Sequence, residues 1–446
     1  MPIERPNPRR QMHLSSDRLA QSLEGELGPD AVTSDPSLLA AYNVDEKAPG
    51  LLCMPLNPEQ VAAALRVCSE ANATITPWGG GTAMAIGNPV RQVDIVIGLE
   101  RLNLLVEHDQ ANLTATVQSG HKLAALQELL SRHNQFLPFD SPAPARATVG
   151  GVVATNLNGP RRSYYGSVRD LVIGMKVVLA SGEQIKAGGK VVKNVAGYDM
   201  CKLFVGSMGT LGIITEVTLR MAPTPETEAT LVASGTLLKL QQFLDELSRS
   251  KLLPSAVLLL NVQARKATDL AQSDWQVALR CEGFEETVAR HLRDALAMAQ
   301  QIGLTTRTLR ENDHSRFWQE TRDFPLQSDR LVYRVTVPRA STSEVAQTVH
   351  NWSTADFHPE IVSDVATGIV WISLADNDLA TQWFTKLIAE ARSHRGHAII
   401  FAAPAHLKRG IDVWGPDPPT LSLMREIKRQ FDPKGLLNPG RFLGGI

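Results

Sequence analysis

The sequence predicts an α+β fold made of more than one domain, and three observations support this prediction. The chain has 446 residues, more than one compact core normally organises. Helix-like and strand-like segments alternate with short connections up to about residue 220. Three glycine-rich passages fall within this first part, and this glycine-rich pattern stops at residues 222–226. We therefore expect a glycine-rich first domain followed by a plainer α+β domain.

The elements of the first part follow from apolar spacing and turn chemistry. Residues 1–14 are rich in proline and arginine without an apolar period, and we expect a loose tail there, with structure beginning near Ser15. A helix is predicted from Asn57, which can cap its free amides, to Asn72. The remaining predictions are strands at 73–77, 93–98, 114–118, 171–179 and 183–186 and a helix over 122–133.

The second part shows helical spacing near residues 236–250 and 285–301, and again over 418–430. Residues 431–442 then return to turn chemistry, with two Pro and two Gly. We therefore divide the chain into the tail 1–14, a first domain 15–224, a second domain 225–410 and a segment 411–446 that returns to the first domain.

Composition excludes several classes of protein. Lys and Arg total 45 against 46 Asp and Glu, so no global field favours nucleic acid or an anionic membrane. The four cysteines are scattered without a C-x-x-C pair, which argues against a zinc site or an iron-sulfur cluster within this chain. No apolar run of about 18 residues and no secretory h-region occurs. We expect a cytoplasmic protein without a transmembrane segment.

The sequence Gly79-Gly80-Gly81-Thr82 follows a predicted strand. Glycines lack the Cβ that keeps a backbone away from a ligand, so successive amides can point at one anion such as a pyrophosphate. A tight turn is the alternative for any glycine triplet taken alone. The motifs G-x-G-x-x-G, G-x-x-x-x-G-K-[ST], G-x-S-x-G and H-E-x-x-H are absent. This disfavours Rossmann, triphosphatase, hydrolase and metalloprotease functions.

Three passages together resemble the FAD-binding domain of the vanillyl-alcohol-oxidase and p-cresol-methylhydroxylase (PCMH) class. They are residues 78–82, residues 147–158, and residues 190–199 leading into 206–216. Residues 192–206 are similar to E-type subunits of bacterial glycolate oxidase. The resemblance covers about residues 30–222 and 431–442, and implies two α+β subdomains that hold FAD plus an α+β cap with an antiparallel sheet.

The resemblance also implies which residues contact FAD. Gly79, Gly80, Gly81 and Thr82 would hold the pyrophosphate, and Asn438 would lie at the flavin ring. The other implied cofactor residues are Pro77, Trp78, Thr148, Val149, Gly150, Gly151, Ala154, Asn156, Gly166, Gly209, Ile213 and Ile214. Some members attach the flavin through a histidine beside the glycine loop, where this chain has Thr82, so non-covalent FAD is expected.

The catalytic residues are less evident. Related 2-hydroxyacid dehydrogenases carry a metal-binding H-x-G-D-G-N-x-H motif in the cap, which this chain lacks. His394 and His397 could share a helix face and a metal, but a solvated helix end is the simpler interpretation, and we expect no metal. Arg322 resembles a cap arginine and could clamp a carboxylate, although pairing with Asp323 or Glu320 on a helix surface is the simpler explanation.

Three functions remain open. The first is the flavin-binding subunit of a glycolate oxidase (2-hydroxyacid dehydrogenase) complex, peripheral to the inner membrane through its partners. Those partners would be a sister FAD subunit that retains the metal motif and an iron-sulfur subunit. The second is a self-sufficient FAD-linked 2-hydroxyacid dehydrogenase, acting for example on D-lactate. A cap longer than is usual for E-type subunits keeps this second possibility open. The third is a non-catalytic subunit that binds FAD structurally. Lys193 and Tyr198 are candidates to approach the flavin or a partner chain.

Overall fold

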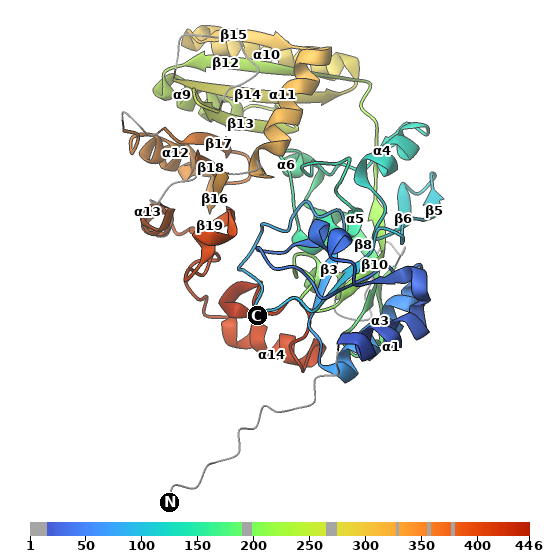
Figure 1. Cartoon of the computed structure of the whole chain (residues 1–446). Coiled ribbons are helices and arrows are strands. Elements are labelled where there is room, and N and C mark those ends of the chain that lie inside the picture. Colours follow the sequence, from blue (N-terminus) through green and yellow to red (C-terminus); the bar gives the residue numbers. More distant parts are fainter. Residues whose placement is uncertain (1–15, 190–198, 265–273, 327–329, 355–357, 376–379) are drawn as a thin grey trace, which may run out of the picture.

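The computed structural model describes residues 16–189, 199–264, 274–326, 330–354, 358–375 and 380–446. In these residues two smaller sheets with their helices lie at one end of the molecule, and an eight-stranded sheet lies at the other (Figure 1). We call residues 16–223 the first region and the eight-stranded sheet with its helices the cap.

A four-stranded sheet begins the first region, in the order β1-β2-β4-β3. Its strands are β1 (Val32–Thr33), β2 (Leu51–Cys53), β3 (Ile75–Trp78) and β4 (Ile95–Gly98). Strands β2 and β3 both run parallel to β4, which requires crossover connections. Helix α3 (Pro58–Ala71) supplies one of them and packs beside α1 (Ser16–Leu27), while the short α2 (Pro36–Leu39) lies in the β1–β2 connection. The Asn57 side chain accepts a hydrogen bond from the Gln60 amide (2.9 Å), as expected of a cap.

A five-stranded antiparallel sheet completes the first region, in the order β5-β6-β10-β8-β9. Its strands are β5 (Leu105–Asp109), β6 (Thr114–Gln118), β8 (Val172–Val178), β9 (Gln184–Gly188) and β10 (Ile213–Arg220). A separate pair joins β7 (Gln135–Phe136) to β11 (Ala222–Pro223). The helices are α4 (Leu123–Ser131), α5 (Val149–Thr155), α6 (Arg162–Tyr165), α7 (Val168–Leu171) and α8 (Cys201–Phe204).

The cap sheet is antiparallel, in the order β15-β12-β14-β13-β17-β18-β16-β19. Its strands are β12 (Thr227–Gly235), β13 (Ala256–Asn261), β14 (Trp275–Gly283), β15 (Thr305–Leu309), β16 (Arg330–Thr336), β17 (Glu360–Asp364), β18 (Ile369–Ala375) and β19 (His397–Ala402). Four helices pack their apolar stripes on one face, namely α9 (Leu237–Arg249), α10 (Glu285–Ile302), α12 (Thr342–His350) and α13 (Ala380–Ser393). The opposite, inner face packs against α11 (Glu311–Asp323) and against apolar residues of the first region.

The C-terminal segment lies against the first region. Helix α14 (Leu421–Phe431) is followed by a turn from which the Asn438 amide donates to the Ile75 carbonyl oxygen (2.8 Å). Leu437 forms a bridge beside β3, which places this segment next to the end of that strand. A second bridge pairs Ile86 with Ala402 at the end of β19 and links the first region to the cap.

The predicted elements are present, with ends that differ by at most three residues. The helix predicted at 122–133 is α4 (Leu123–Ser131), and the strand predicted at 114–118 is β6 (Thr114–Gln118). The predicted antiparallel cap sheet is also present. The predicted tail, residues 1–14, lies outside the described residues, and the division at 224/225 stays a prediction about domains.

Candidate functional site

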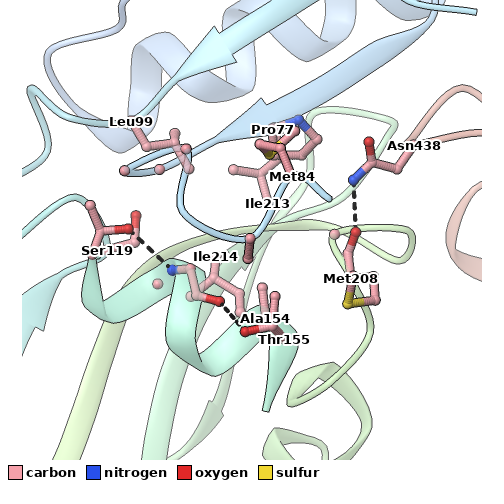
Figure 2. Close-up of a pocket in the computed structure, with 18 of the residues that line it drawn as sticks. Pro77, Met84, Leu99, Ser119, Ala154, Thr155, Met208, Ile213, Ile214 and Asn438 are labelled. Atoms are coloured by element: carbon pink, nitrogen blue, oxygen red, sulfur yellow. Dashed lines mark hydrogen bonds between the residues drawn. The ribbon is translucent and has the colours of Figure 1, made fainter. Parts of the chain in front are cut away.

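A cavity lies between the two sheets of the first region (Figure 2). Its free space is about 720 Å³, part of it open to solvent, which is within the usual range for small-molecule sites. Residues from segments 77–84, 148–155, 208–214 and 438–441 form its wall, together with Leu99 and Ser119. The topology thus brings the three glycine-rich passages and the C-terminal turn to one place.

The glycine loop after β3 is shaped by contacts with its neighbours. A Cβ on Gly80 would lie 1.8 Å from the Arg146 carbonyl oxygen, and one on Gly79 would lie 2.3 Å from the Thr148 hydroxyl oxygen. Gly81 has a φ of +68°, and its Cβ would meet the Trp78 indole at 2.6 Å. The loop therefore needs glycine for its own packing, because any larger residue would displace backbone before it affected a ligand.

Helix α5 presents a second glycine-containing wall. The Thr148 hydroxyl oxygen caps the helix by accepting from the Gly151 amide (3.2 Å). A Cβ on Gly150 would collide with Ser119, whereas one on Gly151 would meet only the Thr148 hydroxyl oxygen, at 3.2 Å. Gly151 is therefore the glycine at which a larger side chain has room to occupy the cavity.

Asn438 closes the cavity from the C-terminal side. Its Nδ2 donates to the Met208 carbonyl oxygen (2.7 Å), and its buried Oδ1 has no hydrogen-bond partner in the described structure. The turn before it is held by buried Lys428, which donates to the carbonyl oxygens of Thr210 (2.7 Å) and Leu437 (2.9 Å). The Lys428 ammonium also contacts the buried Asp432 carboxylate (2.6 Å). An ion pair thus sets the position of Asn438.

A second buried charge cluster lies behind the same wall. Arg441 donates to the carbonyl oxygens of Ile86 (2.7 Å) and Met84 (3.0 Å). Asp45 accepts from Lys408 at 2.6 Å and lies 3.4 Å from Arg441. Burial lowers the pKa of both cations, and the Asp45 carboxylate opposes that shift. These contacts join residues 84–87 to the cap and to the C-terminal segment.

The structure brings most of the predicted cofactor residues together. Those that line the cavity are Pro77, Gly79, Gly80, Gly81, Thr82, Thr148, Gly150, Gly151, Ala154, Gly209, Ile213, Ile214 and Asn438. Trp78 and Val149 are buried behind the wall, Asn156 ends α5 in the left-handed conformation, and Gly166 ends α6 at a φ of +92°. Contact with a cofactor stays a prediction for all of these residues.

Sequence reasoning missed several residues of the wall. They are Ala83, Met84, Leu99, Ser119, Thr155, Met208, Gly212 and Arg441. Arg441 follows Asn438 by three residues in the same turn, so its closeness to a predicted site residue could have identified it. Leu99 and Ser119 follow directly on strands β4 and β6, and only the pairing of the strands shows that they face one cavity.

Arg322, the predicted catalytic residue, lies outside this cavity. Its guanidinium donates to both carboxylate oxygens of Asp323, at 3.0 and 2.8 Å, and Asp323 in turn accepts from the Ala143 amide at 2.9 Å. This is the pairing that the sequence left as an alternative. Arg322 lines a smaller pocket on the inner face of the cap.

The alternative in which His394 and His397 share a helix face does not hold. Helix α13 ends at Ser393, His394 pairs with Glu390 (3.4 Å), and His397 begins β19. Because a strand replaces the helix after residue 396, the two rings belong to different elements. Within the described residues no three His, Cys, Asp or Glu side chains are grouped to hold a metal ion. Lys193 and Tyr198 lie outside the described residues.

An ion-pair network joins the first region to the cap. The Arg161 guanidinium lies 3.0 Å from the Glu282 carboxylate, 3.3 Å from that of Glu228 and 3.9 Å from that of Asp140. Arg280 pairs with the same two glutamates, at 2.9 and 2.7 Å. Burial alone would lower the pKa of Arg161, but the three carboxylates raise it overall. The network thus sets two arginines against three carboxylates at the contact between the two parts.

Comparison with known proteins agrees with this geometry. Residues 49–188 match the FAD binding domain family, and residues 415–442 match the C-terminal domain of FAD linked oxidases. The chain is 27% identical over 430 residues to glycolate oxidase subunit GlcD of Bacillus subtilis, which covers 89% of each chain. It is 28% identical over 387 residues to glycolate oxidase subunit GlcE of Escherichia coli, which covers 85% of this chain and 96% of that one.

One shorter match and one solved structure complete the comparison. A D-lactate dehydrogenase of Anaerostipes hadrus is 36% identical over 213 residues, which is 46% of this chain and 45% of the relative. The crystal structure of p-cresol methylhydroxylase matches with a TM-score of 0.76 at 19% identity, over 95% of this chain and 96% of the other. It shows the shared fold. Among the described residues, no helix has the length and apolar character needed to cross a bilayer.

Proposed function

Because this chain belongs to the FAD-linked oxidoreductases with a PCMH-type FAD-binding domain, we propose that it is the flavin-binding subunit of a glycolate oxidase complex. The complex would oxidise glycolate to glyoxylate and pass two electrons to a partner. Similarity to GlcE over 96% of that relative is the observation that carries this proposal. A sister FAD subunit and an iron-sulfur subunit are the proposed partners, in the cytoplasm and peripheral to the inner membrane.

The residues of the cavity fit the FAD group. The glycine loop lines the cavity without bulky side chains, so a pyrophosphate can approach its backbone closely. The buried oxygens of Asn438 (Oδ1) and Ser119 (Oγ) lack partners in the described structure and offer hydrogen bonds to a polar ligand. Gly79–Thr82 would hold the pyrophosphate non-covalently, and Asn438 would orient the ring. The bound flavin supplies the acceptor for a hydride from the α-carbon of the substrate.

A self-sufficient FAD-linked 2-hydroxyacid dehydrogenase is the second candidate function. Two observations favour it. The similarity to GlcD extends over 89% of both chains, and the match to a D-lactate dehydrogenase reaches 36% identity over part of the chain. Both candidates use the same cavity, and they differ in whether this chain reduces its own flavin.

A visible absorption spectrum of the chain purified alone separates the candidates. We expect flavin bands that persist under anaerobic conditions after glycolate or D-lactate is added, and that bleach when the partner subunits are also present. Bands that bleach in the isolated chain would favour the self-sufficient enzyme. A chain that takes up no flavin after incubation with FAD would contradict both.

The cofactor cavity has its own test in Gly151→Phe. The added ring has room at this position and would occupy the space that FAD needs, so we expect flavin content to fall below about a tenth of the wild-type value. Gly25→Phe is the matched control, because Gly25 is exposed on α1 and a Cβ there meets nothing within 4 Å. Equal flavin content in both folded variants would show that the cavity is not the FAD site.

A further inference from the structure

Arg334 lies on the inner face of the cap sheet, on strand β16. Its neighbours in sequence, Tyr333 and Val335, face the helices on the other side, as the alternation of a strand requires. The guanidinium carbon lies 6.0 Å from the centre of the Trp371 ring and 5.7 Å from that of Phe401. Two aromatic rings on the neighbouring strands therefore fix the position of this cation.

The Arg334 guanidinium has no acceptor within the described structure. No hydrogen bond or ion pair reaches it there, and its buried Nε is without a partner. Arg330, on the same face of the same strand, differs: it donates to the Ser373 hydroxyl oxygen (2.6 Å) and pairs with Glu360 (3.2 Å). A buried donor without an acceptor is unfavourable, so Arg334 is unusual for a purely structural arginine.

The groups around Arg334 leave the site positive. Burial and the nearby Arg162 lower the pKa of Arg334 to about 10, which keeps it charged at neutral pH. His397 lies close enough for Arg334 to lower its pKa further, in addition to the effect of burial. Burial raises the pKa of Asp364 to about 7, so this carboxyl is about half protonated at neutral pH and supplies little negative charge below it. An anion would balance these charges.

The site shares an apolar cluster with the wall of the cofactor cavity. Trp371 and Phe401 belong to the same apolar cluster as Met208, which lines the cavity (Figure 2). Trp371, over whose ring Arg334 lies, also lines a partly open pocket of about 400 Å³ free space. Its wall includes Arg162, Arg322, Asp364 and apolar side chains such as Leu258 and Val362. The pocket suits a small molecule with one charged end.

We propose that Arg334, with Arg162 beside it, binds the carboxylate of a small 2-hydroxy acid at the contact between the first region and the cap. This inference rests on the proposed function and adds a carboxylate subsite to it. The planar guanidinium matches a carboxylate with two parallel hydrogen bonds, and the apolar wall accommodates the short carbon chain. Arg322 is not needed for this role, because Asp323 already occupies its guanidinium.

Binding of oxalate to the FAD-loaded chain tests the subsite without turnover. Oxalate has the carboxylate but no α-hydrogen, and its binding is followed by the change in the visible spectrum of the bound flavin. We expect saturable binding to wild type and an affinity at least about tenfold lower for Arg334→Met. Arg334→Lys should recover part of the affinity, because it keeps the charge and loses the planar fork.

Two matched variants complete the experiment. Arg330→Met removes a paired arginine from the same strand and should change the oxalate affinity by less than about twofold. Arg322→Met tests the rival arginine and should also have little effect. The proposal is overturned if wild type does not bind oxalate, if Arg334→Met and Arg334→Lys bind like wild type, or if Arg322→Met alone loses binding. Arg334-dependent oxalate binding without oxidation of any 2-hydroxy acid, even when the partner subunits are present, would instead refute the proposed function and leave the subsite standing.

Discussion

Two arginines at the contact between the first region and the cap differ in what surrounds them. Arg161 faces three carboxylates within 3.9 Å, which raise its pKa despite burial. Arg334 faces two aromatic rings and other cations, and the pKa of its guanidinium is lowered. In the first arrangement each arginine has carboxylate partners, and the network holds the two parts together. In the second the arginine gains a partner only when an anion is added, which distinguishes a place for a ligand from a structural contact.

The largest expected effect is the loss of stability when Arg161 is replaced. Arg161→Met leaves Glu282, whose side chain is 1% exposed, with one cation fewer, so we expect the free energy of unfolding to fall by about 3–5 kcal/mol. Arg132→Met removes an exposed ion pair with Glu128 and should cost less than about 1 kcal/mol. Denaturant unfolding of both variants measures the difference. Equal losses of stability would show that the Arg161 network does not hold the cap to the first region.

The buried carboxyl of Asp364 provides a second test of the comparison. Its pKa is raised from 3.8 to about 7, so the folded protein keeps a proton that the unfolded chain releases between these values. The free energy of unfolding therefore falls as pH rises from about 4 to about 7. Asp364→Asn lacks this loss. The difference in free energy of unfolding between this variant and wild type should therefore be on the order of 2–4 kcal/mol more favourable to the variant at pH 8 than at pH 4. Thermal midpoints that shift in parallel with pH for both proteins would contradict the buried, protonated carboxyl.

The smallest expected effect is on stability after removal of Arg334. Because its guanidinium has no acceptor in the described structure, Arg334→Met should change the free energy of unfolding by less than about 1 kcal/mol, or increase it slightly. This contrasts with the large loss expected for Arg161→Met. Thermal unfolding without added carboxylate measures it, and a loss of several kcal/mol would mean that Arg334 is structural.

Much of the first region could be predicted from local patterns. The cap at Asn57, the strand at 114–118 and the leucine spacing of α4 are signals contained within a few residues. The ends were less predictable: β3 extends to Trp78 because it pairs with β4 as far as Gly98, and that pairing is not local. The possibility of a helix that carries both His394 and His397 failed for a similar reason, since β19 pairs with β16.

Residues of the cavity wall could be predicted where they belong to a short sequence motif. They could not be predicted where only the fold brings them together. Gly79–Thr82 and Thr148–Gly151 stand out in the sequence, whereas Ser119 and Met208 do not. The reason for glycine at position 80 also required the structure, because contact with the Arg146 carbonyl oxygen has no sequence signature. Arg334 is one arginine among many in the sequence, and only the absence of an acceptor in the described structure singles it out.

The position of Asn438 in the cavity wall has a consequence for biogenesis. Its hydrogen bond to Met208 spans 230 positions of the chain, and Lys428 and Asp432 must be in place to hold the turn that carries it. The ribosome therefore completes the glycine loop long before the wall opposite can form. We expect nascent chains to retain no flavin until this last segment emerges and docks, so cofactor capture reports that synthesis of the domain is complete.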